Sequence, residues 1–197
     1  MKIYIFGLGA IGSNLLTNLV MDTKDVEFII IDKDKVEARN IQAGTQFYFR
    51  DQISNSKVKA LKMNIYNLFG KKIHSQFEVN VDEKNINNIL LPESADLVID
   101  TFDNAVSRNM LRKFCKKFNM NCVHIGFSPQ YTFEVTWNED YQEQDGANQG
   151  IDICEMIGAR AFVQAVSGLA SQVILQFIRD KKKINIAGNK FISKIVS

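Results

Sequence analysis

The N-terminal segment constrains the fold more than any other part of the chain. An apolar run at residues 2–6, KIYIF, leads directly into Gly7, Gly9 and Gly12 and then into a segment with helical spacing. A strand that enters a helix through G-x-G-x-x-G is typical of nucleotide-binding α/β folds. Gly7 permits the turn, Gly9 lets backbone approach a phosphate, and Gly12 allows close packing of the helix. The alternative is a tight turn that binds nothing.

The rest of the chain alternates short apolar runs with amphipathic segments. We predict strands at residues 2–6, 26–32, 74–79, 95–102, 121–127, 131–137 and 190–196. We predict helices at residues 9–21, 56–68, 85–91, 105–118 and 155–179. This alternation predicts a Rossmann-like, doubly wound α/β fold with a mostly parallel sheet and helices on both faces. Antiparallel strands near the C-terminus would extend the sheet.

Composition favours a single domain over residues 1–197, with 46% hydrophobic and 23% charged residues. A net charge of +2 gives no reason to expect a nucleic-acid or membrane partner. Glycines interrupt the apolar N-terminus, so we expect no signal peptide and a cytoplasmic location. The cysteines form no CxxC pair, which argues against a disulfide framework or zinc site. The polar stretch at 138–153 is a candidate lid, crossover loop or disordered loop.

An acidic pair follows the second predicted strand. Asp32 lies 32 − 12 = 20 residues beyond Gly12, where an acid can accept ribose hydroxyls. NAD would use Asp32 but does not need Asp34. Residues two apart in an extended segment project to the same side, so both carboxylates can face a ligand. The alternative is a charged turn, DKDK, whose side chains stay in water.

A second acidic site follows the fourth predicted strand, which ends LVIDTFDN. Asp100 and Asp103 fall at the carboxyl end of that strand, the edge where open α/β sheets bind ligands. Asp103 suits Mg²⁺, which prefers hard oxygen ligands and shares its shell with phosphates and water. Capping of the helix that begins near Ala105 is the alternative role for Asp103 and Asn104. Lys57 could reach a polyphosphate as a point charge.

Together, these motifs resemble the ThiF/MoeB/E1 superfamily, the enzymes that adenylate the C-terminal glycine of ubiquitin-like proteins. The similarity covers residues 3 to about 126, and the long helix after Glu155 resembles the last core helix of the family. The motifs are G-x-G-x-x-G, Asp32-x-Asp34, Asn40, ISNSKVKA with Lys57, and DTFDNAVSR with Asp103, Asn104 and Arg108.

The resemblance implies specific roles. Gly7, Gly9 and Gly12 would lie against ATP. Asp32 would hold the ribose, and Asp34 would support the following loop. Asn40 and Lys57 would contact phosphates and, with the Mg²⁺ ligand Asp103, would be the catalytic residues. The implied cofactors are ATP and Mg²⁺, without zinc. The implied partners are a ubiquitin-like or sulfur-carrier protein and a second subunit, in a homodimer or a heterodimer with another E1-like chain.

Two further positions bear on function: Ala43 departs from the family pattern, and Cys154 lies outside the motifs named above. Ala43 falls where the family motif N-L-x-R-Q has its arginine, and Arg50 is a nearby substitute only in a shifted alignment. Cys154 follows the polar stretch and is a candidate nucleophile, whereas Cys115 and Cys122 fit core positions. Three functions therefore remain: an adenylyltransferase, a non-catalytic E1-like subunit or scaffold that binds nucleotide and partner, and an NAD-dependent oxidoreductase.

Overall fold

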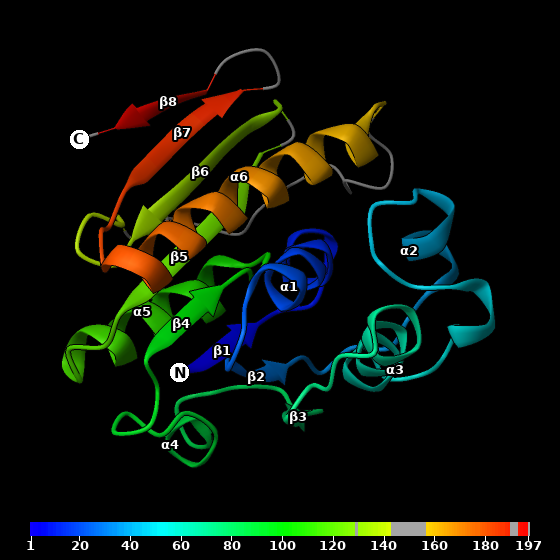
Figure 1. The fold of residues 1–197 in the computed structure, drawn as a ribbon, viewed down its shortest axis with the longest axis horizontal. Coiled ribbons are helices and arrows are strands. Elements are labelled where there is room, and N and C mark those ends of the chain that lie inside the picture. Colours follow the sequence, from blue (N-terminus) through cyan, green and yellow to red (C-terminus); the bar gives the residue numbers. More distant parts are fainter. Residues whose placement is uncertain (129, 143–156, 190–192, 197) are drawn as a thin grey trace.

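The computed structural model contains one eight-stranded sheet (Figure 1). It describes residues 1–128, 130–142, 157–189 and 193–196. The strands are β1 (Lys2–Phe6), β2 (Glu27–Ile31), β3 (Ser75–Phe77), β4 (Leu97–Asp100), β5 (Cys122–Phe127), β6 (Thr132–Trp137), β7 (Asn185–Asn189) and β8 (Ser193–Val196). Their order is β3-β2-β1-β4-β5-β6-β7-β8. Strands β3, β2, β1, β4 and β5 run parallel to one another, and β6, β7 and β8 each pair antiparallel with the strand before them in this order. This arrangement confirms the predicted fold class.

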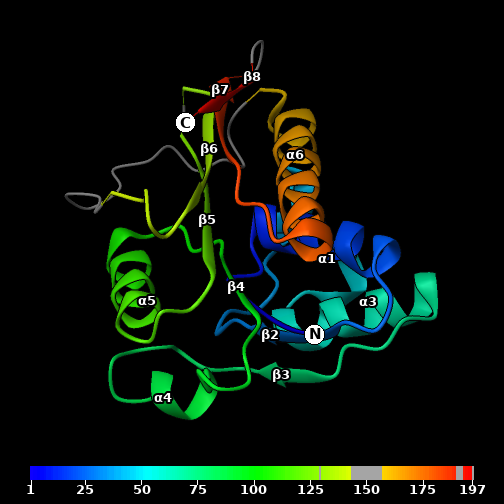
Figure 2. The same cartoon turned by 60° about the vertical axis from the view of Figure 1, so that its left-hand side comes forward.

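Helices cover both faces of the sheet, as predicted. They are α1 (Ala10–Asp22), α2 (Ala38–Gln42), the 3₁₀ helix η1 (Arg50–Gln52), α3 (Lys57–Phe69), α4 (Ile86–Ile89), α5 (Ala105–Lys117) and α6 (Ala159–Asp180). Figure 2 shows α1, α3 and α6 on one side and α4 and α5 on the other. The protein has two hydrophobic cores, and strand β1 contributes to both. Ile3 and Ile5 pack into one core, and Tyr4 and Phe6 pack into the other. Because both faces of such a strand are buried, its sequence is a continuous apolar run.

The strand register brings distant segments to one edge of the sheet. Phe6, the last residue of β1, is aligned with Ile31 of β2 and with Asp100 of β4. The residues that follow these strands therefore meet at the same carboxyl edge. They include the glycine turn after β1, Asp32 after β2 and Thr101 after β4. This is the edge where an open α/β sheet binds its ligands.

Helix α6 is a core helix that packs against α1 and the sheet (Figure 1). Its buried side includes Phe162, Val166 and Ile174. Among the described residues it is the one helix long and apolar enough to cross a membrane, by length and composition only, and half of its most apolar 18-residue stretch is buried inside the protein. The core helix of a globular protein can have the same length and composition. The helix was predicted from residue 155; residues 155 and 156 lie outside the described ranges.

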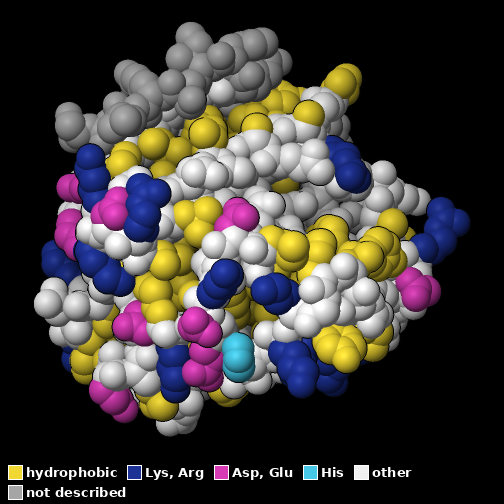
Figure 3. Space-filling view, in the orientation of Figure 1, with side chains coloured by type: hydrophobic (Ala, Val, Ile, Leu, Met, Phe, Trp, Pro, Cys, Tyr) yellow, Lys and Arg dark blue, Asp and Glu magenta, His cyan; other side chains and the backbone are white. Residues whose placement is uncertain are grey.

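Several elements differ from the sequence prediction. Leu68 and Phe118 continue the apolar spacing of the helices predicted at 56–68 and 105–118, which would place them toward the core, but they are 53% and 39% exposed, at the ends of α3 and α5. Hydrophobic side chains gather on the outer surface of α3 in Figure 3, where Met63 and Tyr66 are also exposed. Strand β7 was not predicted. Its sequence, NIAGN, has little strand character, and its pairing with β6 and β8 supplies the strand conformation.

Candidate functional site

The glycine turn is built by close contacts on one side and open space on the other. Gly7 has a φ of +86°, and a Cβ there would lie 2.9 Å from the Thr101 carbonyl oxygen. A Cβ on Gly12 would lie 2.0 Å from the Gly7 oxygen, whereas one on Gly9 would meet no atom within 4 Å. Helix α1 has no side-chain N-cap bond and no acidic residue in its first turn. Its N-terminus is therefore suited to an anion.

These contacts predict that Gly12→Ala destabilises the protein by about 1–3 kcal/mol, because the added methyl group must displace backbone at Gly7. The matched variant Gly9→Ala adds the same atom to open space, and we expect its stability to stay within about 0.5 kcal/mol of the wild type. Urea unfolding of both variants tests the difference. Equal midpoints would show that the Gly12 contact is relieved without cost.

Asp32 ties the loop after β2 to the glycine turn. Its Oδ2 accepts a hydrogen bond of 2.6 Å from the Leu8 N–H, and its Oδ1 accepts one of 2.7 Å from the Asp34 N–H. Burial raises the pKa of Asp32, while Lys57 and the two backbone donors oppose the rise. The Tyr48 hydroxyl donates to the Leu8 carbonyl at 2.7 Å. Since each carboxylate oxygen has more than one lone pair, Asp32 can still accept from a ligand hydroxyl.

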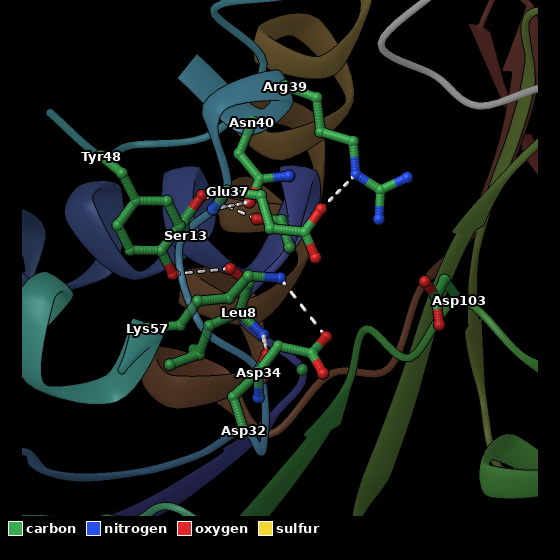
Figure 4. A network of polar contacts seen from close by, with 12 residues as sticks. Leu8, Ser13, Asp32, Asp34, Glu37, Arg39, Asn40, Tyr48, Lys57 and Asp103 are labelled. Atoms are coloured by element: carbon green, nitrogen blue, oxygen red, sulfur yellow. Dashed lines mark hydrogen bonds and ion pairs between the residues drawn. The ribbon is translucent and has the colours of Figure 1, made fainter. Parts of the chain in front are cut away.

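Lys57 lies beside the acidic pair because two chain segments run together there. The Val36 N–H donates to the Asn55 carbonyl, and the Lys57 N–H donates to the Asp34 carbonyl at 3.0 Å. The Lys57 ammonium nitrogen is 3.5 Å from Asp34 Oδ2 (Figure 4). Lys57 is only 7% exposed, so its charge acts in a partly water-excluded place. The structure thus brings together the glycine turn, Asp32, Asp34 and Lys57.

Asn40 is a buried residue of α2. Its Oδ1 accepts a 2.9 Å hydrogen bond from the Glu37 N–H, and the Glu37 side chain accepts in turn from the Asn40 backbone. This reciprocal pair is a capping box that fixes the start of the helix. Arg39, between them, donates through Nε to Glu37 Oε2 at 2.5 Å. The predicted phosphate contact of Asn40 stays a prediction, since its oxygen already holds the helix.

Asp103 stands apart from these residues. Figure 4 shows it across a space from Asp34 and Arg39, and we call this space the gap. The N-cap of α5 is Asn104, whose Oδ1 accepts from the Ser107 N–H at 2.9 Å, so Asp103 is not the capping residue. Asp103 is exposed, with the Asn104 amide nitrogen 3.4 Å from its Oδ1. Its carboxylate thus borders the gap from the β4 side.

The loop that carries Asp103 is held by a buried clamp. Asp100 Oδ1 accepts from the Phe102 N–H at 2.9 Å, and Arg108 Nε donates to the Phe102 carbonyl at 2.5 Å. His124 Nδ1 lies 2.7 Å from Asp100 Oδ2. Burial alone would raise the pKa of Asp100, but the Arg108 charge and the His124 hydrogen bond hold this pKa below its ordinary value. Asp100 and His124 are therefore structural.

Sequence reasoning missed three residues near the site: Glu37, Arg39 and Tyr48. The spacing of Glu37 and Asn40 fits a capping box and could have indicated α2. No local signal marks Tyr48, whose partner is 40 residues away. Cys154 lies outside the described residues, while Cys115 and Cys122 are buried as predicted. Within the described ranges, no group of three or more His, Cys, Asp or Glu side chains could hold a metal ion.

The parallel sheet, the glycine turn and the buried acid after β2 define a Rossmann-like protein with its ligand site at the carboxyl edge of the sheet. The chain belongs to the ThiF family, which it matches over residues 1–196.

Curated relatives include two subunits of SUMO-activating enzymes. Subunit uba-2 of Caenorhabditis elegans is 27% identical over 125 residues, which cover 64% of this chain and 21% of the relative. Subunit 2 of Dictyostelium discoideum is 28% identical over 131 residues, which cover 64% of this chain and 18% of the relative. The chain therefore spans about a fifth of the length of these relatives.

Solved structures show the same fold at lower identity. Escherichia coli MccB, solved with ATP, has a TM-score of 0.75 and 17% identity, with 99% of this chain and 62% of MccB covered. PaaA has a TM-score of 0.74 and 16% identity, with 100% of this chain and 63% of PaaA covered. Both likenesses concern the fold alone.

Proposed function

We propose that the chain binds ATP with Mg²⁺ and activates the C-terminal carboxylate of a ubiquitin-like or sulfur-carrier protein as an acyl-adenylate. One observation above all supports the proposal: the glycine turn, Asp32 and Lys57 lie together at one edge of the sheet. Membership of the ThiF family supports it. So do the relatives named as SUMO-activating enzyme subunits and the MccB structures solved with ATP and with MccA.

Each side chain has a task in this proposal. Asp32 accepts ribose hydroxyls, the N-terminus of α1 receives phosphate, and Lys57 offsets phosphate charge. Mg²⁺ binds through few protein carboxylates together with phosphates and water, which fits the exposed carboxylate of Asp103 at the gap. When bound, the ion would add positive charge to the phosphates. The side-chain amide of Asn40 provides a second contact to phosphate.

The reaction needs orientation and charge more than proton transfer. An oxygen of the substrate carboxylate attacks the α-phosphorus, the new C–O–P linkage forms, and the bond to the bridging oxygen breaks as pyrophosphate leaves. The nucleophile is already anionic at neutral pH, so no general base is required. Alignment of the two reactants can supply up to about 7–11 kcal/mol. The burial of His124 in the clamp is thus compatible with the chemistry.

A non-catalytic E1-like subunit is the second candidate. It is favoured by Ala43, which brings no positive charge, and by the naming of both curated relatives as subunits. In either case we propose a cytoplasmic protein that works as a dimer, with a second copy or with another E1-like chain. An NAD-dependent oxidoreductase would leave Lys57 and Asp103 without a shared purpose, and the family match gives it no support.

One assay separates these candidates. The protein is incubated with ATP, Mg²⁺, labelled pyrophosphate and a candidate carrier protein that ends in Gly-Gly, and label entering ATP is counted. We expect exchange that depends on the carrier. ATP binding by calorimetry without exchange would favour the subunit. An enhanced NADH fluorescence on mixing, with no heat from ATP, would overturn the proposal in favour of the oxidoreductase.

A further inference from the structure

The outer side of α3 carries large apolar side chains that the fold does not bury. Met63 and Tyr66 are 58% and 56% exposed, and their spacing of three residues makes them neighbours on the helix surface. Neither side chain is part of the two hydrophobic cores. Figure 3 shows hydrophobic side chains gathered in this area. The packing of this chain alone therefore does not account for the pair.

The apolar surface continues from α3 to the segment before η1. Phe69 follows Tyr66 by three residues on α3, and its ring stacks with that of Phe47, with 6.4 Å between the ring centroids. Phe47 is in turn 5.9 Å from Phe49, which is 44% exposed. We call the surface made by Met63, Tyr66, Phe69, Phe47 and Phe49 the α3 surface. Continuous apolar surfaces of this kind mark interaction sites.

Hydrogen bonds hold the α3 surface in place. The Asn64 side-chain amide donates to Gln52 Oε1 at 3.1 Å and to the Phe47 carbonyl at 2.9 Å, which ties η1 and the segment before it to α3. Between the two phenylalanines of this segment, the Tyr48 hydroxyl donates to the Leu8 carbonyl in the glycine turn. Preformed surfaces are usual at protein interfaces, where the backbone moves little on binding. A partner on the α3 surface would thus also brace a segment that reaches the nucleotide site.

The area of the α3 surface is of the order that one half of a dimer interface needs. A stable interface buries about 800 Å² on each partner, and about 65% of it is apolar in homodimers. Each copy therefore needs roughly 500 Å² of apolar surface. A whole aromatic side chain buries about 150–250 Å². Three side chains that are 44–58% exposed, with Phe47 and Phe69 partly buried beside them, supply several hundred Å².

The charges around the α3 surface are of both signs. Lys59, on α3, pairs with Glu78 at 3.1 Å. Arg50 and Asp51, which follow Phe49 in the sequence, are both exposed. Each copy thus offers cations to the carboxylates of the other, and such complementarity favours docking. We infer that a second copy of this chain packs on the α3 surface in a twofold dimer. The inference rests on the dimer of the proposed function, but not on its ATP-dependent chemistry.

An anionic membrane is the main rival for this surface. Lys62, Lys71 and Lys72 lie on or directly after α3, and lysines beside apolar side chains attract anionic lipids. The same contact would bring Asp51 and Glu78 against negative charge, which is unfavourable, whereas a second copy has cations for both. The charges therefore favour the dimer, and a measurement with lipid vesicles separates the two.

The test measures the mass of the whole chain in solution by sedimentation equilibrium over a range of concentrations. We expect a wild-type dimer. Tyr66→Glu and Met63→Glu should each raise the dimer dissociation constant at least about tenfold, because each substitution places two charges in the apolar centre of a twofold interface. Tyr66→Phe keeps the aromatic ring, so its dissociation constant should stay within about threefold of wild type.

Leu91→Glu is the matched control. Leu91 is 43% exposed and follows α4, a helix on the opposite side of the sheet from α3 (Figure 2). The same charge replaces an apolar side chain of comparable exposure there, so the dissociation constant should stay within about threefold of wild type. Circular dichroism checks that each variant is folded, as the exposure of the replaced side chains predicts.

Three results would overturn the inference. The first is a wild-type chain that stays monomeric at every concentration, and its cosedimentation with phosphatidylglycerol vesicles would assign the α3 surface to a membrane instead. The second is a dimer that survives both glutamate substitutions, because its interface then lies elsewhere. The third is an equal loss in Leu91→Glu, which would show that position does not matter. A dimer that both substitutions dissociate, but that shows no ATP–pyrophosphate exchange, supports the interface and removes the proposed chemistry. Exchange by a wild-type monomer does the reverse.

Discussion

Lys57→Met is expected to lower the rate of ATP–pyrophosphate exchange by about 10²–10³-fold, the usual cost of removing one group that stabilises transition-state charge. Lys57 is 7% exposed and lies beside Asp34 and near Asp32. Methionine keeps much of the side-chain length and its apolar contacts but removes the charge. The phosphates would then face the acidic pair without its buried counter-charge. Initial exchange rates over a range of ATP concentrations separate an effect on kcat from one on KM.

Lys59→Met provides the control for this prediction. Lys59 is two residues further along α3, its side chain is 67% exposed, and its ammonium pairs with Glu78 at 3.1 Å. Loss of an exposed ion pair changes little, so we expect exchange within about threefold of wild type. A Lys57→Met enzyme that performs as well as Lys59→Met would mean that Lys57 serves only to neutralise Asp34. The phosphate site would then have to be sought elsewhere on the sheet edge.

Lys57→Met should also shift the pH dependence of nucleotide binding. Burial raises the pKa of Asp32, and Lys57 is the first of the effects that oppose this rise. Without Lys57 the pKa of Asp32 rises further, so Asp32 loses its charge at a higher pH. Ribose binding and the bonds from the Leu8 and Asp34 N–H groups favour the ionised carboxylate. As the pH is lowered, nucleotide affinity should therefore begin to fall at a higher pH in Lys57→Met than in wild type. Binding titrations across the acid range measure this shift.

The layered fold was predictable because its signals are local. Parallel strands buried on both faces, such as β1 and β4, appear in the sequence as short apolar runs, and the helices between them keep a 3.6-residue period. Strand β7 lacks such a signal, because its strand conformation comes from pairing with β6 and β8. Leu68 follows the helical period, yet it is exposed in the last turn of α3. Periodicity indicates which face is apolar, but not how far the core extends.

The positions of the candidate site residues could be predicted from the sequence better than the contacts between them. Spacing from the glycines placed Asp32 after β2, and the strand register brings it to the turn as expected. Contacts between segments far apart in sequence could not be predicted in this way. The bond from Tyr48 to Leu8 depends on the path of a whole loop, and the direction of Arg39 depends on the capping box around it. Asp100 and Asp103 show the same limit, because the sequence places both acids at the edge but does not reveal that Asp100 is buried.

Asp100→Ala should be the most destabilising of the substitutions considered. Asp100 is fully buried, accepts from Phe102 and His124, and lies near the Arg108 charge. Removing one partner of a buried charged network leaves the others uncompensated, at a cost of about 3–5 kcal/mol. For a chain of 197 residues this corresponds to a fall in melting temperature of roughly 6–20 °C. Thermal and urea unfolding measure it directly.

Asp103→Ala is the matched control, three residues away and exposed, and its stability should stay within about 0.5 kcal/mol of wild type. The pH dependence gives a second check. Because the folded-state pKa of Asp100 is lowered, its ionised form contributes stability above the unfolded-state value, about 3.9, and that contribution is lost as the pH falls through the folded-state pKa. The difference in stability between wild type and Asp100→Ala should therefore be full at neutral pH and narrow in acid. If Asp103→Ala were the less stable variant, the clamp would not be what holds this loop.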